Sequence, residues 1–286
     1  MSLIVNTNVQ SLVAQKNLTS ATKKLSTATE RMSTGMKINH AADDAAGLFI
    51  ATSLQAQLSG SQQCQTNISL GINVLQIVEG DLTNIQNNVM RIKDLTTQAA
   101  SGTYATSSRD AIAQEITARV AEINRLAVAS RFNGLNLLDG TSPLATTGLK
   151  LQVGAGADQV ANAVTVEPEI FANASQGAIG LNWDPKTSIA TTSAAAAYIA
   201  VCEASLENIT SRRTAIGVAQ SRIEMTAEGL ATTIENISAS KSTIMDTDIA
   251  QTVSDYVNAQ ILQSISTSIL TQANQAPSVA LSLLQS

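Results

Sequence analysis

Large apolar residues recur at heptad spacing near the start of this chain, with small residues between them, which is a pattern typical of closely packed helices. The large members are Leu18, Leu25 and Met32, and the small members are Ala14, Ala21, Ala28 and Gly35. This pattern predicts a first long helix that packs along a narrow seam of large against small residues.

Four further segments show helical periodicity. The second carries Ile68, Leu75, Leu82 and Val89, interleaved with Val78, Ile85 and Ile92. A shorter one carries Ile112, Ile116, Val120, Ile123 and Leu126. The most regular carries Cys202, Ile209, Ile216, Ile223, Leu230, Ile237 and Ile244 at strict intervals of seven. The last carries Ile249, Val253, Val257, Ile261, Ile265 and Ile269. Together they predict a mainly α fold, in which long antiparallel helices form a coiled-coil-like bundle.

The middle of the chain has a different texture. An Asn-Gly pair at Asn133 and Gly134 indicates a turn, and alternating residues in "LKLQVG" and "AVTV" indicate short strands. We therefore expect a small β-hairpin element at about residues 134–166. The stretch 167–193 contains Pro168, Pro185 and Trp183 and is expected to be a short irregular insertion, too poor in apolar residues to form a domain of its own.

Composition narrows the functional classes. Aromatic residues make up 2% of the chain and the formal net charge is -5, with no basic run. Packing must then rely on many small side chains, and nucleic-acid binding is disfavoured because it needs a basic surface. The first residues, "MSLIVNTNVQSLVAQKNL", lack the features of a cleaved secretory signal, and no stretch is long and apolar enough to span a membrane.

The two cysteines match no metal or redox spacing. If the second segment starts near residue 44, opposite the end of a 194–240 helix, Cys64 faces the region of Gln220 and Cys202 faces the region of Leu82. The thiols would then lie about 27 Å apart at 1.5 Å per residue. This geometry excludes a disulfide within one chain.

The stretch "KINHAADDAAG" holds the chain's one histidine, His40. A metal site would need further ligands at matching spacing, so we interpret the stretch as a joint between two helices. In this interpretation Gly35 ends the first helix, Asn39 caps the second, and Asp43 and Asp44 occupy its first turn. No cofactor or metal is expected.

Several stretches resemble bacterial flagellin, the subunit of the flagellar filament. They are "VNTNVQSL", "ATERMSTGMKINHAADDAAGLFIA", "NVLQIVEGDLTNIQNNVMRIKDLTTQAASG", "QEITARVAEINRLAVASRFNGLNLLDG", "LQVGAGAD" and "TDIAQTVSDYVNAQILQSISTSILTQANQAPSVALSLLQS". They cover about residues 3–140 and 195–286 in the family's order. The resemblance implies an inner helical domain of residues 1–43 and 243–286, and an outer helical domain of residues 44–242 with the hairpin at its outer end.

The resemblance implies a structural protein of an extracellular filament used in swimming, exported without a cleaved signal peptide. Both chain ends are expected to be mobile over residues 5–30 and 250–280 until sister molecules cover them. The filament seam is expected at Leu18, Leu25, Met32, Ile249, Val253, Val257, Ile261 and Ile265.

The resemblance also implies partners other than the chain itself: an export chaperone, a filament cap, hook-filament junction proteins and a Toll-like receptor of the host. Receptor-contacting positions of the family fall on Arg91, Leu95 and Glu115. Chaperone-contacting positions fall on Val279, Leu281, Leu283 and Leu284.

The sequence pattern also raises three alternative functions. A hook-filament junction protein has similar ends, and a soluble coiled-coil adaptor would share the helical periodicity. An enzyme is the third, because some flagellins carry a metallopeptidase in the middle, but such a site needs an H-E-x-x-H helix and His40 has no second histidine to join it.

Overall fold

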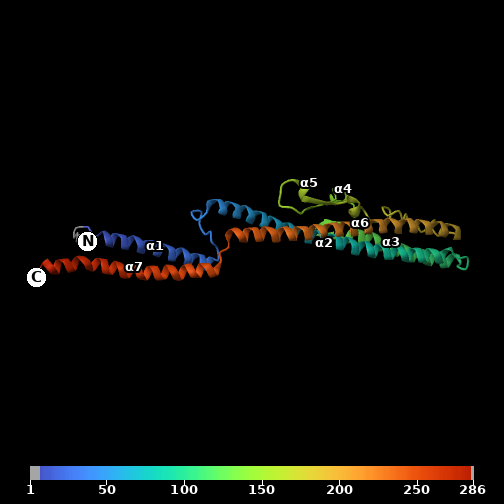
Figure 1. Ribbon diagram of the computed structural model, residues 1–286. Coiled ribbons are helices and arrows are strands. Elements are labelled where there is room, and N and C mark those ends of the chain that lie inside the picture. The colour runs from blue at the N-terminus through green and yellow to red at the C-terminus, as the bar shows by residue number, and fades with distance from the viewer. Residues whose placement is uncertain (1–6, 285–286) are drawn as a thin grey trace. The chain divides into compact units, whose positions relative to one another are not determined.

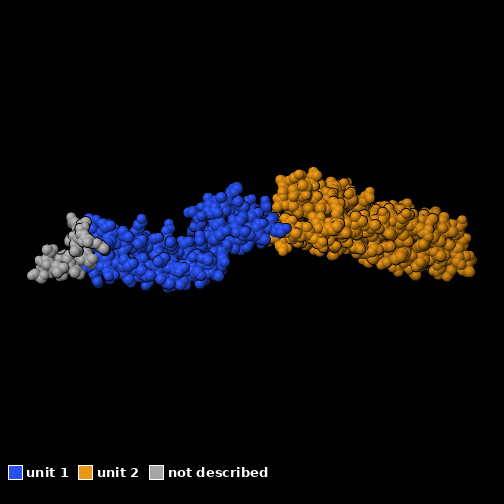
Figure 2. Space-filling model, in the orientation of Figure 1, with its two compact units in different colours: residues 1–58, 236–286 blue, residues 59–235 orange. Residues whose placement is uncertain are grey.

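The computed structural model describes the backbone of residues 7–284, and the side chains of these residues except Gln159 and 276–284. The chain divides into two compact units, residues 1–58 with 236–286 and residues 59–235 (Figure 2). Two long helices, α2 (Ala45–Ala100) and α6 (Thr192–Met245), each contribute to both units. The domain boundaries at 43/44 and 242/243 stay a prediction.

The first unit is built on α1 (Val9–Thr34) and α7 (Ile249–Leu284), which lie side by side (Figure 1). They run antiparallel, because Asn8 at the start of α1 donates a hydrogen bond to the carbonyl of Ala273 while Gly35 after its end accepts one from the backbone of Thr247. Asn8 also caps α1, since its side chain accepts from the backbone N–H of Ser11 at 3.0 Å.

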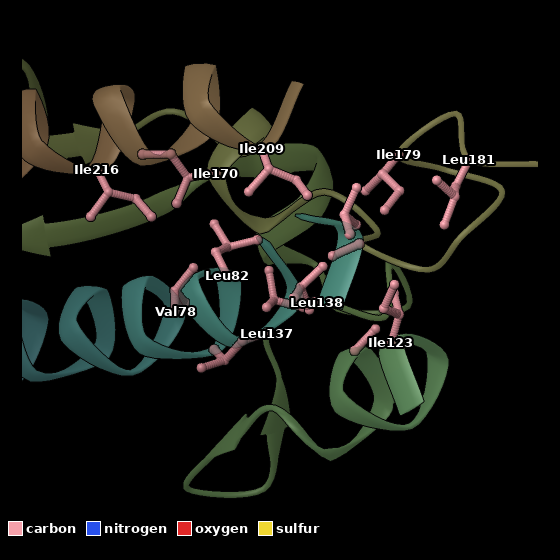
Figure 3. Packing of buried hydrophobic residues seen from close by; sticks show 14 of the residues in the cluster. Val78, Leu82, Ile123, Leu137, Leu138, Ile170, Ile179, Leu181, Ile209 and Ile216 are labelled. Atoms are coloured by element: carbon pink, nitrogen blue, oxygen red, sulfur yellow. The ribbon is translucent and has the colours of Figure 1, made fainter. Parts of the chain in front are cut away.

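The second unit has a continuous hydrophobic core in which α2 and α6 pack against α3 (Thr106–Ala129). Figure 3 shows Val78 and Leu82 of α2 facing Ile209 and Ile216 of α6, with Ile123 of α3 nearby. The predicted heptads lie in this core. Its buried heptad residues are Ile68, Leu75, Leu82 and Val89 on α2 and Cys202, Ile209, Ile216, Ile223 and Leu230 on α6. The predicted mainly α fold with long antiparallel helices is therefore confirmed.

Two small antiparallel β elements follow α3. Strands β1 (Arg131–Phe132) and β2 (Leu135–Asn136) flank a tight turn in which Asn133 and Gly134 both have positive φ, as the Asn-Gly pair predicts. After the short helix α4 (Leu144–Thr147), β3 (Leu149–Gln152) pairs with β4 (Ala163–Val166). The segment that connects these two strands contains the short helix α5 (Gln159–Asn162). The expected hairpin element is thus present. Its predicted place at the outer end is wrong, because the β3–β4 hairpin lies along α2 at Gly60 and Gly71, far from the turn between α2 and α3.

The β3–β4 hairpin lies directly against α2. A Cβ atom added to Gly71 would clash with the side chain of Leu151, so a residue without a side chain at position 71 allows this close approach. The amide of Asn67 also donates to the carbonyl of Gln152 at 3.3 Å. The hairpin is therefore held on the helical unit by both packing and hydrogen bonding.

The stretch 167–193 forms no separate domain, and it adds its apolar residues to the core of the second unit. It begins with the 3₁₀ helix η1 (Pro168–Phe171), and its buried apolar members are Ile170, Phe171, Ala174, Ile179, Leu181, Trp183 and Ile189. The Trp183 indole N–H donates to the Thr117 hydroxyl at 3.0 Å, and its ring meets that of Tyr198 edge to face at 5.3 Å. The tyrosine hydroxyl in turn donates to the carbonyl of Leu181.

The predicted register between α2 and α6 is wrong. Lys93 forms an ion pair with Glu203 at 2.9 Å, so Cys202 lies beside the region of Thr96 and not beside Leu82. Gln220 donates to Glu79, which lies about two heptads from Cys64. The shift arises at the joints: residues 35–44 separate α1 from α2, whereas only 246–248 separate α6 from α7, and Lys241 consequently contacts Gln55.

The corrected register also excludes a disulfide between Cys64 and Cys202 within one chain. Cys64 and Cys202 are free and buried, and the corrected register separates them by about 48 Å along α2 at 1.5 Å per residue. Burial raises the pKa of the Cys64 thiol and raises the pKa of Cys202 to about 11.

Neither thiol of the folded monomer is therefore expected to react within minutes with an aromatic disulfide reagent at about pH 8, while both react in concentrated guanidinium chloride. A Ser69→Cys variant provides the control, because Ser69 is exposed on the same helix as Cys64 and its new thiol should react at once. Rapid reaction of the unmodified native protein would show that the cysteines are more accessible than the structure indicates.

Candidate functional site

The contact between α1 and α7 is made of small side chains. Ala14, Ala21 and Ala28 are buried on α1, at heptad spacing. On α7 the buried positions recur at the same spacing and are Thr252, Ala259, Ser266 and Ala273. Small residues let the two backbones approach closely, but they bury little apolar area. Hydrogen bonds supplement the contact, including one in which the Ser11 hydroxyl donates to the side-chain oxygen of Asn274 at 2.7 Å.

The large apolar residues of this helix pair lie outside the contact. Of the predicted seam residues, Leu18 and Leu25 are half-buried, and the exposed fractions of the others run from 39% to 52%. These exposed members are Met32, Ile249, Val253, Val257, Ile261 and Ile265. The seam of large against small residues expected within the pair is thus replaced by small against small, with the large residues beside it. Their role in a filament seam stays a prediction.

The proposed seam set omits five exposed apolar residues of the same two helices. They are Val9, Leu12, Val13, Leu262 and Ile269. Ile269 continues the apolar run of α7, and on α1 Leu12 and Val13 follow Val9 by three and four residues and so lie on its face. They extend the uncovered apolar surface over the first turns of that helix.

A groove of about 560 Å³ runs along the same helix pair. From α1 it is lined by Lys23, Lys24 and Arg31, and from α7 by Asp255 and Asn258. Cations therefore outnumber carboxylates among the residues that line it. The groove shows that the two helices, even where they touch, leave volume between their outer side chains.

The stretch around His40 is a structural joint. Gly35 ends α1 in the left-handed conformation, with φ of 72°. Its neighbours pair with the start of the returning chain: the backbone of Lys37 donates to the carbonyl of Met245 at 2.7 Å. His40 Nε2 lies 2.8 Å from a carboxylate oxygen of Glu30. Within the described residues, no group of three His, Cys, Asp or Glu side chains is placed to hold a metal ion.

The predicted N-terminal cap of α2, Asn39, is wrong. Asp44, not Asn39, caps α2, because its side chain accepts from the backbone N–H of Gly47 at 2.9 Å and the helix begins at Ala45. Asp43 lies before the helix and accepts from the backbone N–H groups of His40 and Asn39, which lowers the pKa of its carboxyl group. Local competition among neighbouring Asn and Asp side chains decided the cap, and spacing alone does not resolve it.

The three receptor positions differ in accessibility. Arg91 and Glu115 lie on the surface, where the guanidinium donates from Nε and Nη2 to one carboxylate oxygen at 3.2 and 3.1 Å. Leu95 is 2% exposed and belongs to the core of the second unit. A buried side chain cannot contact a partner, so the prediction that Leu95 is a receptor-contacting residue is wrong. The role of Arg91 and Glu115 stays a prediction.

The proposed chaperone contacts lie outside the described side chains. They are Val279, Leu281, Leu283 and Leu284. Among the described residues, no helix has the length and hydropathy needed to cross a lipid bilayer.

Comparisons with known proteins show which family the sequence of this chain resembles. Residues 5–143 match the family described as the bacterial flagellin N-terminal helical region, and residues 199–284 match the bacterial flagellin C-terminal helical region. The chain is 33% identical to the flagellar filament 30.7 kDa core protein of Treponema maltophilum, over 99% of this chain and all of that protein. It is 35% identical to a flagellin of Xenorhabdus nematophila over the full length of both.

A solved structure of a putative flagellar hook-associated protein from Vibrio parahaemolyticus is similar in fold, with a TM-score of 0.58 over 71% of this chain and all of that one. Its sequence identity is 14%, so the likeness concerns the fold alone. The two family matches, one on each side of the middle segment, and the full-length relatives lead to one assignment. This chain belongs to the bacterial flagellin family.

Proposed function

We propose that the exposed apolar faces of α1 and α7 are the surfaces by which this chain assembles. As a flagellin, it is a structural subunit of the flagellar filament. The observation that carries the finer proposal is the division of side chains in the helix pair: small residues meet within the chain and large apolar residues remain uncovered. Exposed apolar side chains gathered on one pair of helices are typical of a protein–protein contact surface.

The expected energies favour a lattice over a simple dimer. Full burial of one large aliphatic side chain contributes about 1.5–3 kcal/mol, and these side chains are already about half covered in the monomer, so a neighbour that covers three of them contributes on the order of 2–5 kcal/mol. Association itself costs an estimated 4–15 kcal/mol in lost freedom of motion. One neighbour is therefore marginal, whereas several neighbours that cover different parts of the same faces stabilise an assembly.

The form of the assembly follows from the kind of contact. When one surface of a copy packs against a different surface of the next, the contact does not close on itself and generates a helical polymer. The working role is then self-association and transmission of torque along the polymer, which needs no catalytic turnover. The filament lies outside the cell, and the chain reaches it by export.

The further partners proposed for this chain are an export chaperone, a filament cap, hook-filament junction proteins and a Toll-like receptor of the host. The support for the receptor is the exposed Arg91–Glu115 pair, although two exposed ion-paired residues also suit a contact between subunits. The support for the chaperone is the apolar run "SVALSLL" near the end of the chain, which would need masking before export.

Growth of filaments from purified protein tests the proposal. After addition of short filament seeds, electron microscopy is expected to show long filaments whose mass increases with the concentration of free monomer. Size-exclusion chromatography of the unseeded protein provides the comparison and should show monomer. A discrete small oligomer under every condition, with no elongation of seeds, would favour a soluble coiled-coil adaptor instead.

A further inference from the structure

Phe49 is an outlier among the aromatic side chains of this chain. It is 75% exposed, whereas Phe171, Trp183 and Tyr198 are buried and the other described aromatic side chains are at least half-buried. It lies in the second turn of α2, and the adjacent Ile50 is 48% exposed. In a chain with 2% aromatic residues, an aromatic ring and a branched side chain side by side in water call for a partner.

An unfilled apolar groove lies on the second unit, between α6 and the β4–η1 segment. Its volume is about 440 Å³. Its apolar lining comes from Val164, Val166 and Ile170 on one side and Ala215, Val218 and Ala219 on the other. Figure 3 shows Ile170, which lines this groove, next to the core residue Ile216 of α6. A cavity of about 150 Å³ is enough to bind benzene in an apolar core, so this groove has room for a phenyl ring.

The rim of the groove suits an aromatic occupant. Val218 is 65% exposed, and one heptad further along α6 Met225 is 63% exposed, so the apolar surface continues beyond the groove. Arg222 also lines it, and within the described residues its guanidinium has no ion pair or hydrogen bond. A guanidinium at the edge of an apolar slot is placed to stack over an aromatic ring, which a purely aliphatic occupant would not use.

We propose that Phe49 of one copy inserts into this α6–β4 groove of a second copy and thereby forms one of the contacts between subunits. The inference rests on the proposed function, because a self-assembling chain must carry both halves of each non-closing contact on different parts of its surface. Phe49 and the α6–β4 groove are such a pair: a protruding apolar group on one unit and an unfilled apolar recess on the other. The second copy is the occupant because the filament is built from copies of this chain.

A substitution series at Phe49 tests the energetic side of the proposal. Phe49→Ala is expected to raise the critical concentration for filament elongation about 10-fold or more, and Phe49→Leu less, because leucine restores part of the buried area. The helical circular dichroism of the monomer should not change, since the ring is exposed there. Unchanged critical concentrations for both variants, with the parent protein elongating seeds, would overturn this contact and leave the proposed function intact.

Cross-linking tests the geometry. A variant with both Phe49→Cys and Val218→Cys is expected to form a ladder of disulfide-linked multimers when its filaments are oxidised, and the parent protein should form none because Cys64 and Cys202 are buried. The matched control replaces Val218→Cys with Val128→Cys, at an exposed apolar position on α3. Equal ladders for the two variants, or a bond confined to single chains, would contradict insertion of Phe49 into a second copy.

Discussion

A variant in which Ile261 and Ile265 are both replaced by aspartate is expected to stay a folded monomer and to form no filaments. Both side chains are about half exposed in the single chain, so the folded state loses little when they become polar. In an assembly that buries this face, two carboxylates would enter an apolar contact without partners. The variant loses the contacts of two apolar side chains and must also bury two charges in the assembly. Because each 1.4 kcal/mol corresponds to a factor of ten, we expect the critical concentration to rise at least about 100-fold.

Sedimentation of filaments after seeding measures this effect. Val160→Asp is the matched control, because Val160 is 93% exposed near the end of the β3–β4 hairpin and has no place in the predicted seam. The control should elongate seeds at nearly the concentration of the parent protein. Equal impairment by both substitutions would mean that added negative charge, and not the face of α7, limits assembly.

Leu82→Ala is expected to lower the free energy of unfolding of the second unit by about 3 kcal/mol. Leu82 is fully buried between α2 and α6, and removal of a buried leucine side chain typically costs about 2–5 kcal/mol, because a cavity remains. Leu70→Ala on the same helix is the control, since Leu70 is 47% exposed and its loss should cost less than about 1 kcal/mol.

Trp183 gives a direct readout of this difference. It is the chain's one tryptophan, and it lies in the core of the second unit, so urea titrations followed by its fluorescence report on that unit. The midpoint for Leu82→Ala should fall well below that for Leu70→Ala at an unchanged slope. Similar midpoints would mean that the α2–α6 seam contributes less to stability than its burial indicates.

The sequence predicted the second unit better than the first. Heptads of Leu, Ile and Val on α2 and α6 specify a buried seam wherever two such helices meet, and both sets are buried in one core. On α1 and α7 the same periodicity is compatible with two different contact faces, one of large residues and one of small residues, because the two kinds alternate. Which set faces the partner helix depends on how closely the backbones approach, and that distance is not encoded in spacing alone.

Two of the wrong predictions, the register of α6 against α2 and the cap of α2, concern the segments that connect the helices. The register of α6 against α2 depends on the lengths of two joints, and a shift of two heptads preserves the match of apolar positions, so the hydrophobic pattern alone does not distinguish the two registers. The cap of α2 depended on which of several neighbouring polar side chains reaches the helix N-terminus. The exposure of Phe49 is not predictable from the pattern, because a single exposed aromatic residue interrupts no periodicity.

Amide hydrogen exchange of the monomer and the filament tests the central claim, that sister molecules complete the α1–α7 pair. In the monomer, amides of residues 9–34 and 249–275 should exchange much faster than those of residues 75–95 and 205–230, which lie in the fully packed unit. In the filament both groups should be strongly protected. Strong protection of α1 and α7 in the dilute monomer, unchanged on assembly, would contradict the account.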